Sequence, residues 1–448
     1  KGSNKAHTDD NPGKHFRYAG EKGAAGESQS LGHHTGHIQD AQAPVEIAHA
    51  SQIFGGRVQN LHIILTQEHH GQGASEQNQD QTRKQSVAHG HRNALKQSLP
   101  DTLRLTGSQV LAAEYRGRRR QRVKGTQRKL FDLHCDTLYE CCETGKHLRE
   151  NDLHVNRTAA QRYEHYVQFF ALFCGAYPPE SQKKKRSCLL DTPKDERLAR
   201  MLQTAQTEFA ANADWLTLCR SGEELTRAAE SGKAAAFLSI EGAELLPERE
   251  GALDEAYDAG VRLVTLTWNY RSRFGCPSAI DQNEGLTDGG RQLVRALDAR
   301  RMLIDVSHLS DRGFWDVCEL TDRPFVATHS DSRALCRNSR NLTDEQFAEI
   351  AQRGGLVGIN LYTPFLVRQS DSVLDDAIDH IERFIGMYGE KIVALGCDFD
   401  GCDQLPVGIE GLGDMYRLAD RMLALGYREE TVRGLFYDNA FAFVQKML

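Results

Sequence analysis

Eight short apolar runs recur in the second part of the chain, with stretches of helical periodicity such as 197–211 and 290–300 between them. Runs that are apolar throughout and alternate with amphipathic helices are typical of a parallel sheet covered by helices. Eight is also the strand number of a closed (β/α)8 barrel. We therefore expect an α/β protein with a TIM-like (β/α)8 barrel. The runs are 130–133, 169–173, 235–240, 263–267, 303–306, 325–328, 356–361 and 392–395.

An open, doubly wound sheet would show the same alternation, but such a sheet carries a Gly-rich phosphate loop after its first strand. No loop of that kind follows the run at 130–133. One helix between the runs is well marked at both ends. Thr343 and Gln346 form a Thr-x-x-Gln capping box, and Gly354 and Gly355 stop the helix. The closed barrel is the favoured architecture.

Residues 1–127 differ in composition from the remainder. They are rich in Gly, Gln, His, Ser and Asn, and 11 of the 18 histidines lie there without a repeated ligand spacing. Such a segment buries too little apolar surface to offset the entropy of the chain. It begins with Lys1 rather than Met, and its basic run at 116–120 has no aromatic or structured surroundings. We expect a disordered or non-native extension at 1–127, followed by the barrel at 128–448.

Charge and cysteine usage restrict the partners and the compartment. A formal net charge of -7 argues against nucleic acid as a partner, because phosphate binding requires a basic face. No run approaches the roughly 18 apolar residues of a membrane helix, and no basic-then-apolar signal segment opens the chain. The 11 cysteines all follow residue 130 without regular spacing, which favours reduced thiols over a disulfide framework. We expect a cytoplasmic protein without a membrane partner.

Polar side chains that can bind metal ions end five of the eight runs. In a parallel barrel, these ends meet at one mouth, where barrel active sites are built. One histidine after a strand is usually an ordinary polar residue, but five such ends are hard to produce by chance. The residues are His134 and Asp136 after the first run, Glu241 after the third, His308 after the fifth, His329 after the sixth and Asp398 after the eighth.

Imidazole and carboxylate groups together suit zinc or a similar divalent ion. His134 and Asp136 are two residues apart, so both side chains are expected on one face of a strand. His308 and His329 are suited to a second ion, with Glu241 between the two ions. A pair of ions activates water and polarises a carbonyl group, which is hydrolytic chemistry.

The sequence alone leaves two candidate roles for Asp398. It is a candidate proton shuttle that takes a proton from water and passes it to the leaving amine. Its alternative role is to hold a ligand histidine in place. Asp400, next on the same face, reads as structural.

These residues lie in motifs that, taken in order, resemble the renal (membrane) dipeptidase family of binuclear zinc peptidases. The resemblance extends over nearly all of the second part of the chain. It implies a barrel enzyme that hydrolyses dipeptides with two Zn²⁺ ions per chain, and it implies a homodimer. The motifs are FDLHCD at 131–136, SIEG at 239–242, GLTDGGR at 285–291, IDVSH at 304–308, THS at 328–330, SRN at 339–341, GGLV at 354–357 and GCDFDG at 396–401.

The resemblance also assigns roles to single residues. It implies that His134 and Asp136 bind one zinc ion, that His308 and His329 bind the other, and that Glu241 bridges them.

Asp398 corresponds to the acid/base carboxylate of the family, and Arg340 to an arginine that engages the substrate. A guanidinium suits that role, because a dipeptide presents a free carboxylate for a bidentate contact. Tyr362 is expected to line the same pocket, although packing would explain an aromatic residue there equally well.

One position departs from the family pattern. The mammalian enzymes carry a histidine after the fourth strand that helps to bind the developing oxyanion, whereas this chain has Trp268, Asn269 and Tyr270. The indole N–H of Trp268 or the amide of Asn269 is expected to donate a hydrogen bond there instead. Packing at the barrel rim is the alternative for Trp268.

Two other functions remain open from the sequence. The first is another barrel metallohydrolase, such as a deaminase, lactonase or phosphotriesterase; Glu241 counts against it, because several of those enzymes bridge their metals with a modified lysine. The second is a binding protein on a retained barrel, which the full set of ligand residues disfavours. Metal content and substrate profiling separate these hypotheses.

Overall fold

A computed structural model of the protein describes residues 128–173, 175 and 187–448. The expectations for residues 1–127 and for a domain boundary at 127 lie outside the described residues. Within the described ranges, none of the helices combines the length and the apolar character needed to span a bilayer.

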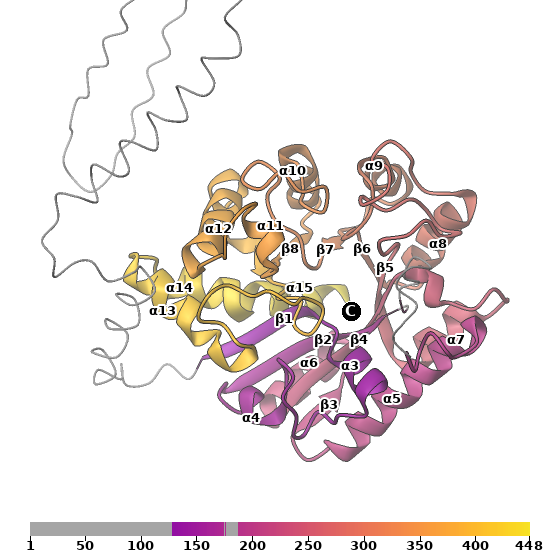
Figure 1. Ribbon diagram of the computed structural model, residues 1–448, viewed down its shortest axis with the longest axis horizontal. Helices are drawn as coiled ribbons and strands as arrows, with labels where there is room; N and C mark the ends of the chain where they lie inside the picture. The colour runs from indigo at the N-terminus through magenta and orange to yellow at the C-terminus, as the bar shows by residue number, and fades with distance from the viewer. Residues whose placement is uncertain (1–127, 174, 176–186) are drawn as a thin grey trace, which may run out of the picture. The chain divides into compact units, whose positions relative to one another are not determined.

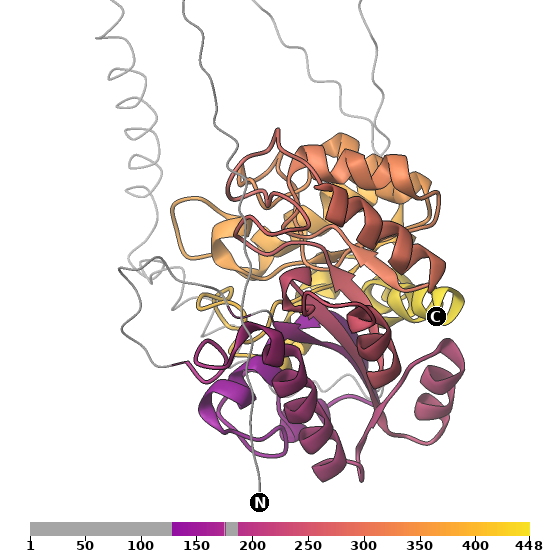
Figure 2. The same ribbon diagram turned by 90° about the vertical axis from the view of Figure 1, so that its right-hand side faces the viewer.

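Eight parallel strands form a closed ring with helices around it (Figures 1 and 2), which confirms the predicted (β/α)8 barrel. The ring closes because β2 pairs with β1 on one edge and with β4 on the other. Each of the eight apolar runs overlaps one strand. The strands are β1 (Lys129–Cys135), β2 (His165–Phe173), β4 (Ala234–Glu241), β5 (Val261–Thr265), β6 (Leu303–Asp305), β7 (Val326–Ala327), β8 (Leu356–Ile359) and β9 (Val393–Leu395).

A further strand, β3 (Leu216–Leu218), was not expected from the sequence. It pairs only with Ala234 to Ala236 at the start of β4. Since β2 occupies the opposite edge of β4 and β5 pairs with β4 only from Leu238 onward, β3 lies beside the part of β4 that precedes β5. The strand therefore does not belong to the closed ring.

Helices connect the strands and cover the outside of the barrel (Figure 1). Several begin at side-chain caps, and the capping box of Thr343 and Gln346 is confirmed at the start of α10. The helices are α3 (Thr137–Thr144), α4 (Arg157–Ala160), α5 (Arg197–Ala211), α6 (Gly222–Glu230), α7 (Ala252–Ala259), α8 (Asp288–Ala299), α9 (Asp311–Leu320), α10 (Asp344–Gln352), α11 (Thr363–Leu366), α12 (Leu374–Tyr388), α13 (Tyr416–Ala424), α14 (Glu429–Arg433) and α15 (Asn439–Met447).

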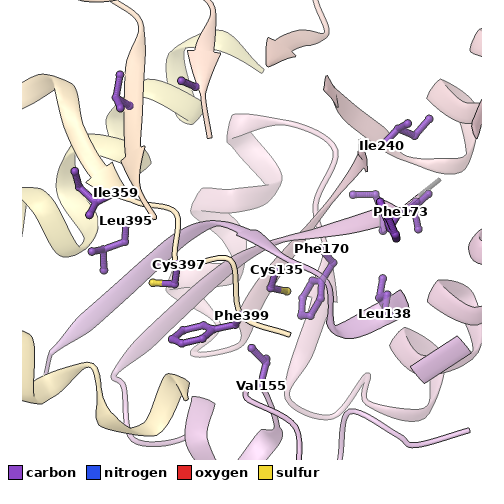
Figure 3. Packing of buried hydrophobic residues seen from close by; sticks show 14 of the residues in the cluster. Cys135, Leu138, Val155, Phe170, Phe173, Ile240, Ile359, Leu395, Cys397 and Phe399 are labelled. Atoms are coloured by element: carbon purple, nitrogen blue, oxygen red, sulfur yellow. The ribbon is translucent and has the colours of Figure 1, made fainter. Parts of the chain in front are cut away.

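The larger apolar cluster lies between the strands and the helices. It includes Phe170 of β2 and Ile240 of β4, and it extends past the strand ends to Phe399, as Figure 3 shows. Burying one such aromatic or aliphatic side chain stabilises the fold by about 1.5–3 kcal/mol. This cluster fixes the helices against the barrel wall.

A second apolar cluster fills the barrel interior near the beginnings of the strands. Alternate strand residues belong to it, and they pack against the π-helical turn Gly434–Asp438 and α15 at the C-terminal end of the chain. We call this cluster the floor. It closes one end of the barrel, so only the opposite end, the mouth, is available for polar side chains. The strand residues of the floor are Phe131, Leu133, Val167, Phe169, Ala235, Phe237, Leu263, Leu303, Val326, Leu356 and Ala394.

Candidate metal centre

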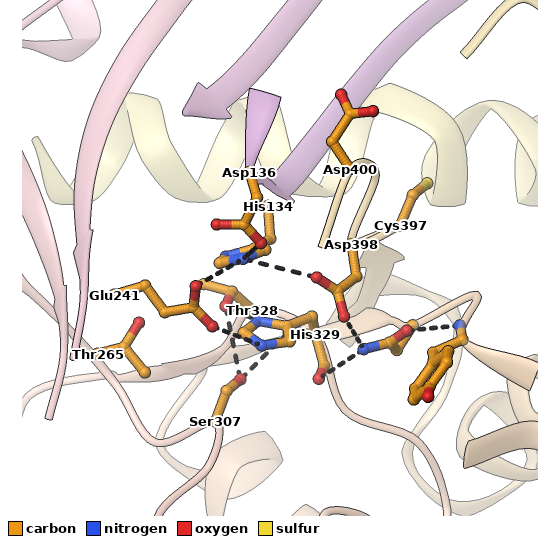
Figure 4. A network of polar contacts seen from close by, with 12 residues as sticks. His134, Asp136, Glu241, Thr265, Ser307, Thr328, His329, Cys397, Asp398 and Asp400 are labelled. Carbon is orange, nitrogen blue, oxygen red and sulfur yellow. Dashed lines mark hydrogen bonds and ion pairs between the residues drawn. The ribbon is translucent and has the colours of Figure 1, made fainter. Parts of the chain in front are cut away.

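The first pair of predicted ligands lies where β1 meets α3. The pairing of β1 with β2 shifts register between Asp132 and Cys135, and irregularities of this kind re-aim side chains next to active sites. His134 lies in this interval and points toward Glu241 (Figure 4). Asp136 is the N-cap residue of α3 rather than a strand residue. Its carboxylate nevertheless lies near His134, with 3.5 Å between Nε2 and Oδ2.

Glu241 is the last residue of β4, and its side chain lies between the two predicted ligand pairs. Its Oε2 is 3.6 Å from Nε2 of His134. Its Oε1 is 3.0 Å from Nε2 of His308 and 3.6 Å from Nε2 of His329. Each carboxylate oxygen therefore faces a different pair, which is the arrangement that a bridging ligand requires.

Two of the predicted site residues adopt backbone conformations that side chains rarely accept. His308 has φ of 68° and Asp398 has φ of 60°. The left-handed region costs non-glycine residues of order 1 kcal/mol, although His and Asp are enriched among the exceptions. The surrounding fold maintains both conformations, which indicates that the position of these two side chains matters more than local stability.

His308 and His329 have their ring protons directed away from the site. Nδ1 of His308 donates to Oδ1 of Asn269 at 2.9 Å. Nδ1 of His329 lies 2.7 Å from Oγ1 of Thr328. The hydroxyl group of Thr328 donates its own proton to Oδ2 of Asp305. Burial lowers the pKa of both imidazoles well below its ordinary value, so both are neutral.

The consequence is an electron-rich site. With Nδ1 protonated on each neutral ring, both Nε2 atoms carry lone pairs, and these atoms are only 3.0 Å apart. Oε1 of Glu241 faces the same space. Three lone-pair donors that converge on one point repel one another unless a cation lies between them. The residues therefore fit a divalent metal ion.

The pair formed by His134 and Asp136 also fits a positively charged ion. Both ring nitrogens of His134 and Oδ1 of Asp136 are buried and have no hydrogen-bond partner among the described residues. Burial alone would lower the pKa of His134, but the carboxylates of Glu241 and Asp136 raise it well above its usual value. Burial, reinforced by Asp136, raises the pKa of Glu241 to about 8. Without a metal ion, His134 and Glu241 therefore hold protons that a bound metal ion would displace.

Three overlapping groups of ligand atoms result, each with all atoms within 4.8 Å of one another. They are Glu241 with His308 and His329, His134 with Asp136 and Glu241, and His134 with His329 and Asp398. Glu241 is shared by the first two groups.

The chain matches the family model "Membrane dipeptidase (Peptidase family M19)" over residues 118–447. It belongs to that family. The chain is therefore a metallo-dipeptidase, a hydrolase that acts on peptide bonds and depends on a metal.

The chain is also similar to a curated relative and to solved structures. An uncharacterized protein in the pqqA 5′ region of Klebsiella pneumoniae is 38% identical over 241 residues, which are 52% of this chain and 89% of that protein. A metallopeptidase from Rhodobacter sphaeroides, liganded with a phosphinate mimic of the dipeptide L-Ala-D-Ala, has a similar structure. The TM-score is 0.65 at 26% identity, covering 72% of this chain and 100% of that one.

A second solved structure, the dipeptidase AC of family M19, has a TM-score of 0.64 at 26% identity and covers 72% of this chain and 99% of that chain. The probable dipeptidase PvdM from Pseudomonas aeruginosa has a TM-score of 0.62 at 18% identity, covering 76% of this chain and 98% of that one, and shows the shared fold alone.

Arg340 of the dipeptidase is buried, as are the predicted metal ligands. One guanidinium nitrogen, Nη2, contacts the carbonyl oxygen of His329 at 3.4 Å, and the guanidinium lies 5.2 Å from the ring of Phe365. Nε and Nη1 have no hydrogen-bond partner among the described residues. Burial lowers the pKa of Arg340 from its usual value, with nearby carboxylates acting in the opposite direction. Two buried, unpaired donors on one guanidinium fit an anionic group of a ligand.

The structure places the remaining predicted residues around the dipeptidase site. Trp268 packs edge-on against Phe173 with 4.9 Å between ring centroids, and its ring is 6.2 Å from that of His308. The oxygen of the Asn269 side chain contacts the predicted ligand His308. Tyr362 is the residue before α11, and its ring packs against Phe365 at 4.9 Å. Trp268 and Asn269 are thus adjacent to the ligands, and Tyr362 lies beside Phe365, the ring that Arg340 also contacts.

Three residues at the site were not singled out from the sequence. Asn360 donates from Nδ2 to Oδ2 of Asp398 at 3.1 Å, and Thr328 and Asp305 lie behind His329 (Figure 4 shows Thr328). Asp305 is fully buried inside the apolar run at 303–306. A charged residue within such a run was the signal that could have identified it, because buried carboxylates require partners.

Proposed function

We propose that the dipeptidase holds two Zn²⁺ ions at the barrel mouth. His134 and Asp136 would hold one ion, His308 and His329 the other, and Glu241 would bridge them. The observation that carries this proposal is the approach of two neutral imidazole Nε2 atoms to 3.0 Å, with a carboxylate oxygen facing both. Three imidazole and two carboxylate ligands suit zinc better than calcium or magnesium, which prefer oxygen ligands throughout.

When bound, the ions would polarise the scissile carbonyl group and lower the pKa of water at the site. The residues of the chain supply the proton transfer and the substrate contacts. Asp398 lies 3.8 Å from His134, measured from Oδ1 to Nε2, and its other oxygen accepts from Asn360. Burial raises the pKa of Asp398, so the carboxyl group can both accept a proton from water and release it to the leaving amine.

Arg340 would bind the free carboxylate of the dipeptide. Its Nε and Nη1 donors are buried without a partner among the described residues, and a carboxylate of the substrate would compensate for the loss of their contacts with water. Arg340 and the proposed metal ligands would together select substrates by length, since a longer peptide presents its carboxylate farther from the scissile bond.

The solved relative with an L-Ala-D-Ala mimic supports dipeptides as substrates, including those with a D-residue at the second position. Trp268 and Asn269 remain candidates for contacts with the substrate or its oxyanion, and Tyr362 for the pocket wall. We also propose a homodimer, from the family resemblance. A reducing compartment such as the cytoplasm is supported by the ten described cysteines, which are all free thiols.

The test combines metal content with a substrate panel. The purified full chain is stripped with a chelator, restored with Zn²⁺ and assayed with dipeptides carrying L- or D-residues at the second position, and with tripeptides. We expect two zinc ions per chain and zinc-dependent cleavage of dipeptides alone. Glu241→Gln is expected to abolish activity, whereas Glu248→Gln, a control at an exposed glutamate, retains it. A protein that binds two zinc ions and leaves every dipeptide intact would contradict the proposal.

A further inference from the structure

Asp305 is the centre of a buried hydrogen-bond network behind the metal centre. The residue is 0% exposed, and its carboxylate accepts four hydrogen bonds. Oδ1 accepts from the backbone N–H groups of Ser307 at 3.0 Å and Thr328 at 2.9 Å. Oδ2 accepts from the hydroxyl groups of Thr265 and Thr328, each at 2.7 Å. A carboxylate so surrounded by donors is fixed in position.

The direction of each proton follows from these contacts. The single proton of the Thr328 hydroxyl is committed to Asp305, so Oγ1 of Thr328 can only accept from the nearby Nδ1 of His329, 2.7 Å away. The ring of His329 therefore has its proton on Nδ1 and its lone pair on Nε2. Carboxylate, hydroxyl and imidazole form one chain that ends at a lone pair directed into the site.

His308 is held in the same way by a different group. Its Nδ1 donates to the side-chain oxygen of Asn269 at 2.9 Å, which also leaves the lone pair on Nε2. His134 differs from both, because its Nδ1 has no hydrogen-bond partner among the described residues. The two proposed zinc positions are therefore supported unequally by the protein around them.

We propose that Asp305, Thr328 and Asn269 are positioning residues that set the zinc affinity of the His308–His329 position and not that of the His134–Asp136 position. The inference rests on the proposed two-zinc site. Partners of this kind fix the tautomer and orientation of a ligand histidine, and their loss typically lowers metal affinity by about 10- to 100-fold.

The experiment measures zinc binding to the metal-free full chain by competition with a chromogenic chelator, which resolves tight from weaker binding. In Thr328→Val, one of the two ions is expected to bind about 10- to 100-fold more weakly, with the other unchanged. Thr328→Ser, which keeps the hydroxyl, is expected to restore wild-type binding. Thr321→Val serves as a matched control, since Thr321 is also buried but its hydroxyl accepts only from the backbone of Arg323.

Asn269 provides an independent arm. Asn269→Asp keeps an acceptor for the Nδ1 proton of His308 and is expected to retain both ions, whereas Asn269→Leu is expected to weaken the same ion as Thr328→Val does. The inference would be overturned if Thr328→Val bound both ions like the wild type, if Thr328→Ser failed to restore binding, or if Thr321→Val lost as much affinity. A wild-type chain that binds fewer than two zinc ions would instead contradict the proposed function.

Discussion

At the floor of the barrel, the inward-facing side chains are apolar and packed, whereas a few residues farther along the same strands, at the mouth, they are polar and their lone pairs converge. In β4 the change occurs between Phe237 and Glu241. Phe237 stacks on Phe169 with ring centroids 4.9 Å apart and planes inclined by 16°. Glu241 lies among groups whose lone pairs and charges oppose each other.

The difference shows how one set of strands both stabilises the fold and holds an unfavourable site. Aromatic stacking and close packing at the floor contribute stability that does not depend on a ligand. The mouth accepts left-handed backbone at His308 and Asp398 and buried groups without partners, which lower stability until a ligand binds. Substitutions at the two ends should therefore affect different measurements.

The largest expected effect lies at the mouth. Asp398→Asn removes the proton acceptor, and we expect kcat to fall by about 10²- to 10⁴-fold. Both zinc ions should remain bound, because the proposed ligands are intact. Metal content is measured beside the rate, with the exposed Asp322→Asn as the control. Loss of one ion in Asp398→Asn would show that this carboxylate is a metal ligand rather than a proton shuttle.

A substitution at the floor should lower the stability of the fold and leave the zinc content unchanged. Phe169 lies between Phe131 and Phe237, and Phe169→Ala leaves a cavity in the barrel interior. We expect the free energy of unfolding to fall by about 3–5 kcal/mol. Chemical denaturation measures this loss, and zinc content at a temperature where the variant is folded should equal that of the wild type. A variant of unchanged stability that has lost a zinc ion would break the proposed division between floor and mouth.

Adding a single methyl group at Gly401 tests how tightly the side chains at the mouth are packed. A Cβ at Gly401 would lie 2.2 Å from Oδ2 of Asp136 and 2.3 Å from Oδ1 of Asp398, so Gly401→Ala must displace both carboxylates. Since displacements of about 1 Å can cost 10²-fold in rate, we expect kcat/KM to fall by about that factor. Gly386→Ala, in α12 with nothing within 4 Å of the new methyl group, should leave activity unchanged. Equal effects of the two substitutions would contradict the steric account.

The smallest expected effect concerns the pH response of His165, whose ring contacts Tyr437 of the floor. Burial, with the charge of Lys129, lowers the pKa of His165 to about 4, and its Nδ1 accepts from the hydroxyl of Tyr437 at 2.5 Å. The unfolded chain, where the pKa is near 6.5, then binds more protons than the folded chain between pH 6.5 and 4. Stability therefore falls as the pH falls, by about 2 kcal/mol between pH 7 and pH 5 from this residue.

The measurement compares urea unfolding of metal-free wild type and His165→Phe across that range. The difference between the two pH slopes isolates His165 from the carboxylates and histidines of the mouth. Parallel slopes would show that His165 does not titrate as its surroundings require.

The sequence predicted the eight barrel strands and the residues at their ends because both depend on local pattern. It missed β3, because Leu216–Leu218 is a three-residue strand that pairs along one edge only, and such a segment has no recognisable period. It placed Asp136 on the first strand, although the residue caps α3. Backbone geometry beyond the strand end decided that difference, while proximity to His134 was unaffected.

The contacts behind the ligands were not predictable in the same way. The contact between the side-chain oxygen of Asn269 and His308, 39 residues away in the chain, was not foreseen. Asp305 was read as part of an apolar run. Both contacts depend on how separate strands meet and on side-chain torsions, which a single sequence does not encode in any local pattern.

The left-handed backbone at His308 and Asp398 limits how the proposed metal centre could be redesigned for another metal. Exchanging the proposed ligand His308 for cysteine, or for a β-branched residue, would add backbone strain to the change in coordination. Asparagine, aspartate and glycine are the residues that accept this conformation most readily. Position 308 therefore favours oxygen donors over sulfur as substitutes, whereas His134 and His329, which are not among the positive-φ residues, carry no such restriction.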